Sequence, residues 1–128
     1  MSERTSIRSV VSASMLTVCS ALALSPVFAA GFPTGSYQAK NLTLTFDDKG
    51  QFHVNMGETT EVSGSYSVKG GQIELTDVKG AWACTNPGQQ TGSYNWKLNG
   101  TALTFSKVTD GCDERSKTLV PVAWKAQK

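Results

Sequence analysis

The chain has 128 residues, with 12 basic side chains, 10 acidic side chains and one histidine, which gives a formal net charge of +2 at pH 7. This near balance lacks the excess positive charge that drives binding to nucleic acid or to an anionic membrane, so we expect neither partner. The length suits one domain, and any serine triad would depend on the single histidine.

Residues 1–29 have the pattern of an export signal. Arg4 and Arg8 form a charged start, an apolar stretch follows, and Val27 and Ala29 satisfy the small-x-small rule for cleavage. We therefore expect cleavage after Ala29 and a periplasmic or secreted location for the mature protein.

Two alternatives to a cleaved signal remain. A membrane anchor needs roughly 20 apolar residues, and the run here is shorter and is interrupted by serine and threonine. Lipidation would use Cys19, but the bulky Val18 precedes it where a small residue is expected. We expect no integral membrane span in the mature domain, residues 30–128.

The mature domain contains two cysteines, Cys84 and Cys112, in loops on either side of a hairpin. Because exported proteins meet oxidising surroundings, we expect these residues to form a disulfide rather than a metal or redox site. Closing a loop between cysteines 28 positions apart contributes about 3.5 kcal/mol through chain entropy. We expect no metal and no other cofactor.

Alternating apolar and polar residues, bounded by turn signals, predict eight strands. The predicted strands are 35–39, 41–46, 51–56, 62–68, 72–76, 92–98, 101–107 and 117–124. A Gly-Ser-Tyr triplet recurs at Gly35, Gly64 and Gly92, and Asn99-Gly100 supplies a two-residue hairpin turn. No segment carries a helical apolar stripe of useful length.

The residues expected to face inward are mostly large and apolar. They are Leu42, Leu44, Phe46, Phe52, Val54, Met56, Tyr66, Val68, Ile73, Leu75, Tyr94, Trp96, Leu98, Leu103, Phe105, Val120, Val122 and Trp124. The interior of an eight-stranded barrel is either just filled by such side chains or roomy enough for one small ligand, and both alternatives stay open.

The position of the cysteines is compatible with an up-and-down closed sheet. In such a sheet alternate connections lie at the same end, and the loops that hold Cys84 and Cys112 are two connections apart. The tight turns at 49–50, 70–71 and 99–100 gather at the opposite end. We therefore predict an all-β fold, an eight-stranded antiparallel up-and-down barrel with one disulfide and long loops at one open end.

Several short motifs carry a resemblance to a known family. They are Gly35-x-Tyr37, the repeated Gly-Ser-Tyr, Leu75-Thr76-Asp77 with Gly80 and Cys84, Gly92-x-Tyr94-x-Trp96, and Asp110-x-Cys112-x-x-Arg115. With these motifs the chain resembles small secreted bacterial lipocalin-like (calycin) β-barrel proteins. The resemblance implies an eight-stranded barrel, transport of a small apolar ligand, and packing of Tyr37 beneath Arg115.

The candidate ligand-binding residues are aromatic, with one cation. They are Trp82, Tyr37, Tyr66, Tyr94, Trp96 and Arg115. Trp82 either covers the disulfide or plugs the barrel mouth, or it contacts a ligand or partner at the rim. Arg115 either pairs with Asp110, Asp113 or Glu114 or binds an anion.

These observations predict an exported, monomeric barrel that binds a small hydrophobic ligand at its open end. One alternative is a protein-binding barrel such as a periplasmic protease inhibitor, which would need an exposed extended segment such as 31–34. Another is a filled structural module. Catalysis is less expected, because His53 lies mid-strand facing solvent and only Asp77 or Asp110 remains for acid–base chemistry.

Overall fold

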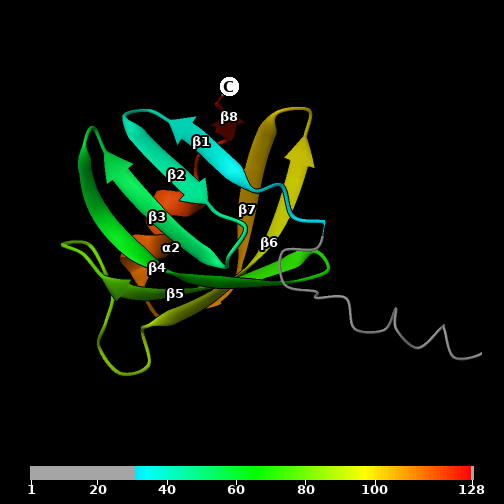
Figure 1. The fold of residues 1–128 in the computed structure, drawn as a ribbon. Helices are drawn as coiled ribbons and strands as arrows, with labels where there is room; N and C mark the ends of the chain where they lie inside the picture. Colours follow the sequence, from blue (N-terminus) through cyan, green and yellow to red (C-terminus); the bar gives the residue numbers. More distant parts are fainter. Residues whose placement is uncertain (1–30, 128) are drawn as a thin grey trace, which may run out of the picture.

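The computed structural model describes residues 31–127, which form a closed barrel of eight strands (Figure 1). The strands are β1 (Gly35–Ala39), β2 (Leu42–Phe46), β3 (Gln51–Met56), β4 (Thr59–Lys69), β5 (Gln72–Lys79), β6 (Thr91–Asn99), β7 (Ala102–Asp110) and β8 (Trp124–Ala126), and the helix α2 (Asp113–Leu119) precedes β8. Each strand pairs antiparallel with the next, and β8 closes the sheet onto β1. The predicted eight-stranded up-and-down barrel is confirmed. The predicted signal peptide lies outside the described residues.

The prediction for the last strand is wrong. Residues 117–124 were expected to be extended, but α2 occupies the first part of this range and β8 begins only at Trp124. The helix forms because the Cys112 sulfur accepts a hydrogen bond from the Arg115 backbone N–H, and because acidic residues in the first turn and Lys117 in the last turn suit the helix dipole. A seven-residue helix with two buried side chains is too short to show an apolar stripe.

Two of the repeated Gly-Ser-Tyr glycines mark places where the sheet allows no side chain. The register of the pairing between β4 and β5 shifts beside Gly64, where a Cβ atom would overlap the Thr76 carbonyl. The register between β6 and β7 shifts between Ser93 and Tyr94, and a Cβ atom on the adjacent Gly92 would overlap the Asp110 carboxylate. The repeat therefore reflects local close approaches in the barrel wall.

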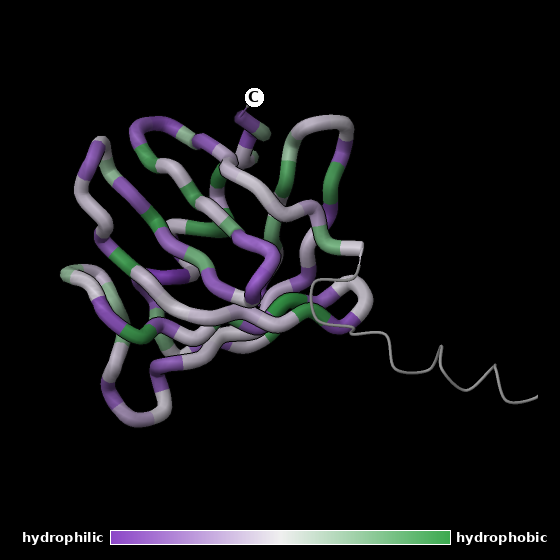
Figure 2. Tube along the Cα trace, viewed as in Figure 1, coloured by the Kyte–Doolittle hydropathy of each residue, from purple (hydrophilic) through white to green (hydrophobic). Residues whose placement is uncertain are grey.

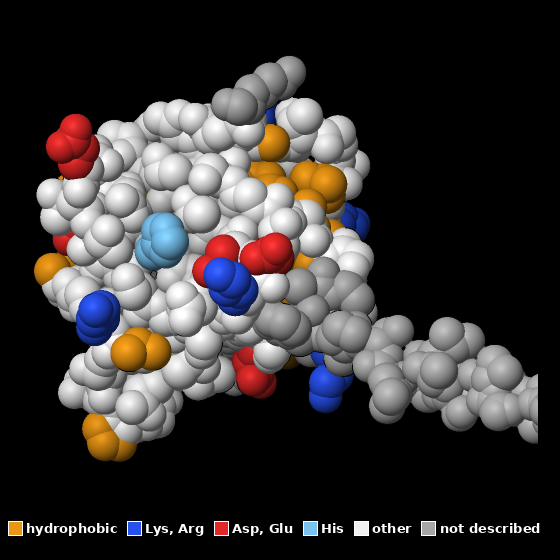
Figure 3. All heavy atoms as spheres, in the orientation of Figure 1, with side chains coloured by type: hydrophobic (Ala, Val, Ile, Leu, Met, Phe, Trp, Pro, Cys, Tyr) orange, Lys and Arg blue, Asp and Glu red, His pale blue; other side chains and the backbone are white. Residues whose placement is uncertain are grey.

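Apolar and polar residues alternate along the strands (Figure 2). The buried core consists mainly of the apolar ones. The most deeply buried large side chains are Leu44, Phe46, Ile73, Leu75, Tyr94, Leu103 and Trp124. Met56 and Leu98 are predicted to face inward, but they are 37% and 41% exposed. Each lies at the end of a strand next to a hairpin turn, where the barrel ends. On the face drawn in Figure 3, positive and negative side chains are interspersed.

The end of the barrel with the tight turns is plugged by Phe32, which precedes the first strand. Its ring packs against the rings of Phe46 at 4.9 Å, Trp96 at 5.0 Å and Tyr66 at 5.7 Å between centroids. Phe32 is only 5% exposed, so its side chain anchors segment 31–34 to the core, while Gly31 and Thr34 stay exposed. We call this end the closed end.

Candidate functional site

A pocket of about 520 Å³ lies at the opposite end of the barrel, the disulfide end. Its inner wall consists of apolar side chains of β3, β4 and β5: Phe52, Val54, Val62 and Leu75. Its outer walls are the loop between β5 and β6, here called the 80–90 loop, and the helix α2, which contributes Thr118 and Leu119. The pocket is therefore a gap between the barrel interior and two added segments.

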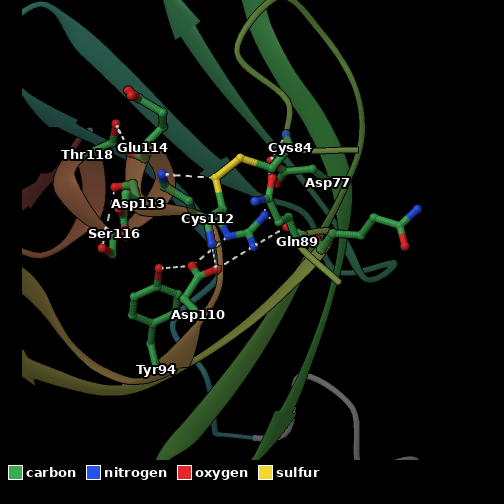
Figure 4. Close-up of a disulfide and its surroundings, with 12 residues drawn as sticks. Asp77, Cys84, Gln89, Tyr94, Asp110, Cys112, Asp113, Glu114, Ser116 and Thr118 are labelled. Atoms are coloured by element: carbon green, nitrogen blue, oxygen red, sulfur yellow. Dashed lines mark hydrogen bonds and ion pairs between the residues drawn. A yellow bond between two sulfur atoms is a disulfide. The ribbon is translucent and has the colours of Figure 1, made fainter. Parts of the chain in front are cut away.

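The Cys84–Cys112 disulfide joins those two segments (Figure 4). The Cα atoms are 6.2 Å apart, Cys84 belongs to the 80–90 loop, and Cys112 is the N-cap of α2. The predicted pairing is confirmed. Because both outer walls are attached to this bond, the disulfide fixes the pocket's shape as well as stabilising the chain.

Arg115 links the same two walls to the barrel through hydrogen bonds and ion pairs. Its guanidinium donates to both carboxylate oxygens of Asp110, at 2.8 and 2.6 Å, and to the backbone carbonyls of Gln89 and Gln90, at 2.9 and 3.1 Å. A second ion pair of 3.1 Å links Arg115 to Asp77 on β5. The residue is thus a structural partner of carboxylates, and its acidic partners are Asp77 and Asp110 rather than the neighbouring acids of its own helix.

Asp110 is held in its charged form by the groups around it. Burial alone would raise the pKa of this carboxyl, but hydrogen bonds from Arg115, Tyr94 and the Cys112 backbone N–H more than offset that effect, so the pKa lies below its ordinary value. Burial, reinforced by the bond to Asp110, raises the pKa of Tyr94, which keeps the phenol protonated. These groups form a fixed polar network beneath the pocket.

Asp77 uses only one of its two oxygens. Its Oδ2 atom accepts from the Cys84 backbone N–H at 2.8 Å and faces Arg115, whereas Oδ1 is buried and accepts no hydrogen bond within the described part of the chain. Asp77 is 5% exposed and lines the pocket. Sequence reasoning treated this residue only as a weak catalytic candidate, since nothing local indicates that β5 turns it toward Arg115.

Trp82 lies at the rim of the pocket. Its backbone N–H donates to the Glu61 carbonyl at 3.0 Å, which ties the 80–90 loop to β4, and its side chain is 38% exposed while also lining the pocket. The indole is therefore placed to contact both solvent and anything that enters.

The six predicted ligand-binding residues divide between the two ends of the barrel. Trp82 and Arg115 line the pocket, and Tyr94 lies beneath it. The other three belong to the closed end, with their polar atoms satisfied locally: Tyr37 donates to Pro33, Tyr66 to Asp47 and Trp96 to Gly70.

The packing of Tyr37 beneath Arg115, which the family resemblance implied, is not what the structure shows. The hydroxyl of Tyr37 is bonded to the Pro33 carbonyl, and the tyrosine joined to Arg115 through Asp110 is Tyr94. Sequence reasoning missed Val62 and Leu119 as pocket residues. The spacing of Cys112 and Arg115, one helical turn, was the available signal for the helix that carries Leu119.

Comparisons of the chain with protein-family models, curated proteins and solved structures gave no match. The fold itself, a closed eight-stranded antiparallel barrel, is consistent with the calycin-like architecture. Within residues 31–127 there is no helix of the length and apolar character needed to cross a membrane, and no cluster of acidic, histidine or cysteine side chains arranged to hold a metal ion.

Proposed function

We propose that this protein is an exported barrel that binds a small hydrophobic ligand in the pocket at its disulfide end. The observation that carries the proposal is the pocket itself, about 520 Å³ with an inner wall of Phe52, Val54, Val62 and Leu75. This volume falls in the range of small-molecule sites, and an apolar wall with few polar groups is typical of them.

The surroundings support the same proposal. The disulfide and the Arg115 network hold the outer walls in place before any ligand arrives, which lowers the entropy that binding has to overcome. The disulfide is compatible with a location outside the cytoplasm, as export to the periplasm or medium requires.

The experiment is titration of the mature protein with N-phenyl-1-naphthylamine, a neutral apolar probe whose fluorescence rises in apolar surroundings. Thr118→Trp fills the pocket from α2 and should weaken probe binding by about tenfold or more. The matched control is Lys117→Trp, which adds the same indole to the next residue of the helix, an exposed one outside the pocket.

Unchanged affinity in the Thr118→Trp variant would place the probe elsewhere on the protein. Absence of any probe binding to the wild-type protein, together with no co-purifying small molecule in native mass spectrometry, would favour the filled structural module instead.

A further inference from the structure

We infer that the ligand of this pocket is an amphipathic amine, with an apolar body against the barrel wall and a primary ammonium group that donates to Asp77 Oδ1. The inference rests on the pocket being the ligand site proposed above. It is argued from the polar side of the pocket, where one buried acceptor has no hydrogen bond and the acidic side chains outnumber the basic one.

The first observation is the unused acceptor. A buried carboxylate oxygen without a hydrogen bond costs free energy, and such atoms are rare in folded proteins. Asp77 Oδ1 is such an atom within the described residues, and its side chain cannot rotate to relieve it, because Oδ2 is held by the Cys84 N–H at 2.8 Å and by Arg115 at 3.1 Å. The missing partner is a donor, which excludes a ligand that offers only acceptors.

The second observation is the charge. Two buried carboxylates, Asp77 and Asp110, share one cation, Arg115, so the network beneath the pocket keeps one uncompensated negative charge. Among the described lining residues Arg115 is the only cation, and Glu114 adds a further carboxylate at the rim. A positively charged donor compensates this excess, whereas a carboxylate ligand would increase it.

The third observation is the geometry of the entrance. Trp82, at the rim, offers an aromatic face that attracts an ammonium group as it passes, while Phe52, Val62 and Leu75 receive the apolar body. Oδ1 is buried in this structure, so the ammonium reaches it through rearrangement of the side chains that line the pocket, while the disulfide still holds the 80–90 loop.

The test compares octylamine, octanol, octanoate and octyltrimethylammonium, which share one chain and differ in the head group, by isothermal titration calorimetry with the mature, disulfide-bonded protein. Octylamine should bind about tenfold or more tightly than octanol, and octanoate should bind most weakly. The trimethylated cation, which has the charge but no donor, should bind more weakly than octylamine.

Asp77→Asn should reduce the ratio of octylamine affinity to octanol affinity to within about threefold, and this ratio is the readout because Asp77 also supports the pocket wall. Asp113→Asn is the matched control, because it removes the same charge from an exposed position outside the pocket and should leave the preference intact. If Asp77→Asn does not fold, the head-group series on the wild-type protein decides alone.

Equal affinities for octylamine and octanol, or for octylamine and octyltrimethylammonium, would overturn the amine inference and leave the hydrophobic pocket standing. Failure of all four compounds and of the neutral probe would overturn the proposed function itself.

Discussion

Arg115 is 8% exposed, and its guanidinium meets acceptors on three separate segments: β5, the 80–90 loop and the end of β7. A planar group with five fixed N–H donors can serve all of them at once, which a lysine ammonium cannot. The residue therefore connects the barrel wall to both segments that enclose the pocket, although it belongs to a helix of only seven residues.

Arg115→Lys should lower the free energy of unfolding by about 2 to 4 kcal/mol, because the shorter, single-nitrogen cation leaves buried carboxylate and carbonyl oxygens without donors. Urea denaturation measures the change. Lys117→Ala, which removes an exposed cation from the same helix, should leave the free energy of unfolding nearly unchanged. Equal effects of the two substitutions would contradict the role given to Arg115.

Asp110 should make the stability of the protein depend on acid pH. Its pKa is lower in the folded protein than in the unfolded chain, so its contribution is complete above the unfolded value, about 3.9, and is lost as pH falls through the folded value. Asp110→Asn should lower stability at pH 7, and the difference from wild type should narrow toward pH 2. Denaturation curves collected from pH 7 to pH 2 provide the measurement, and a constant difference would show that this carboxyl is not the group involved.

At the scale of elements, α2 and the 80–90 loop are additions to a barrel that the strands alone close. The sheet is continuous through β8, yet the pocket exists only because these two segments stand away from the inner face of β3 to β5. Both depend on the disulfide, since Cys112 caps the helix and Cys84 anchors the loop.

Replacing both cysteines by alanine should lower the free energy of unfolding by about 2 to 4 kcal/mol, given the 28-residue separation of the bridged positions. The double substitution avoids a free thiol. Probe affinity should fall as well, and amide hydrogen exchange should accelerate in the 80–90 loop and α2 more than in β2 and β3. Uniform acceleration across the barrel would show that the bond stabilises the whole fold without specifically holding the pocket.

At the scale of the molecule, the sequence could predict those features of the fold that neighbouring residues determine, and not those that depend on residues far apart in the chain. The positions of β1 to β7 follow from two-residue alternation and from turn residues, which are local signals. The structure has α2 where the sequence predicts part of the last strand. This helix depends on a cysteine cap and on the burial of Arg115 among groups from distant strands, which are not local signals. The division of the aromatic residues between two ends depends on the stagger of the closed sheet, which no single strand encodes.

Phe32 illustrates the same limit. It precedes the first strand, so the alternation of apolar and polar residues does not predict that it is buried. Its ring nevertheless packs against three aromatic rings and fills the closed end. Phe32→Ala should therefore lower the free energy of unfolding by about 3 to 5 kcal/mol through the cavity it leaves, without weakening probe binding at the disulfide end.

Trp82→Ala should behave in the opposite way. Its side chain is 38% exposed, so the loss of stability should be smaller than for Phe32→Ala, while probe affinity should fall by about 1 to 3 kcal/mol because a pocket contact is removed. Urea denaturation and probe titration on the same two variants make the comparison. If Trp82→Ala is the more destabilising and leaves probe uptake unchanged, Trp82 is a plug for the disulfide end just as Phe32 is for the closed end, and the two ends of the barrel do not differ in function.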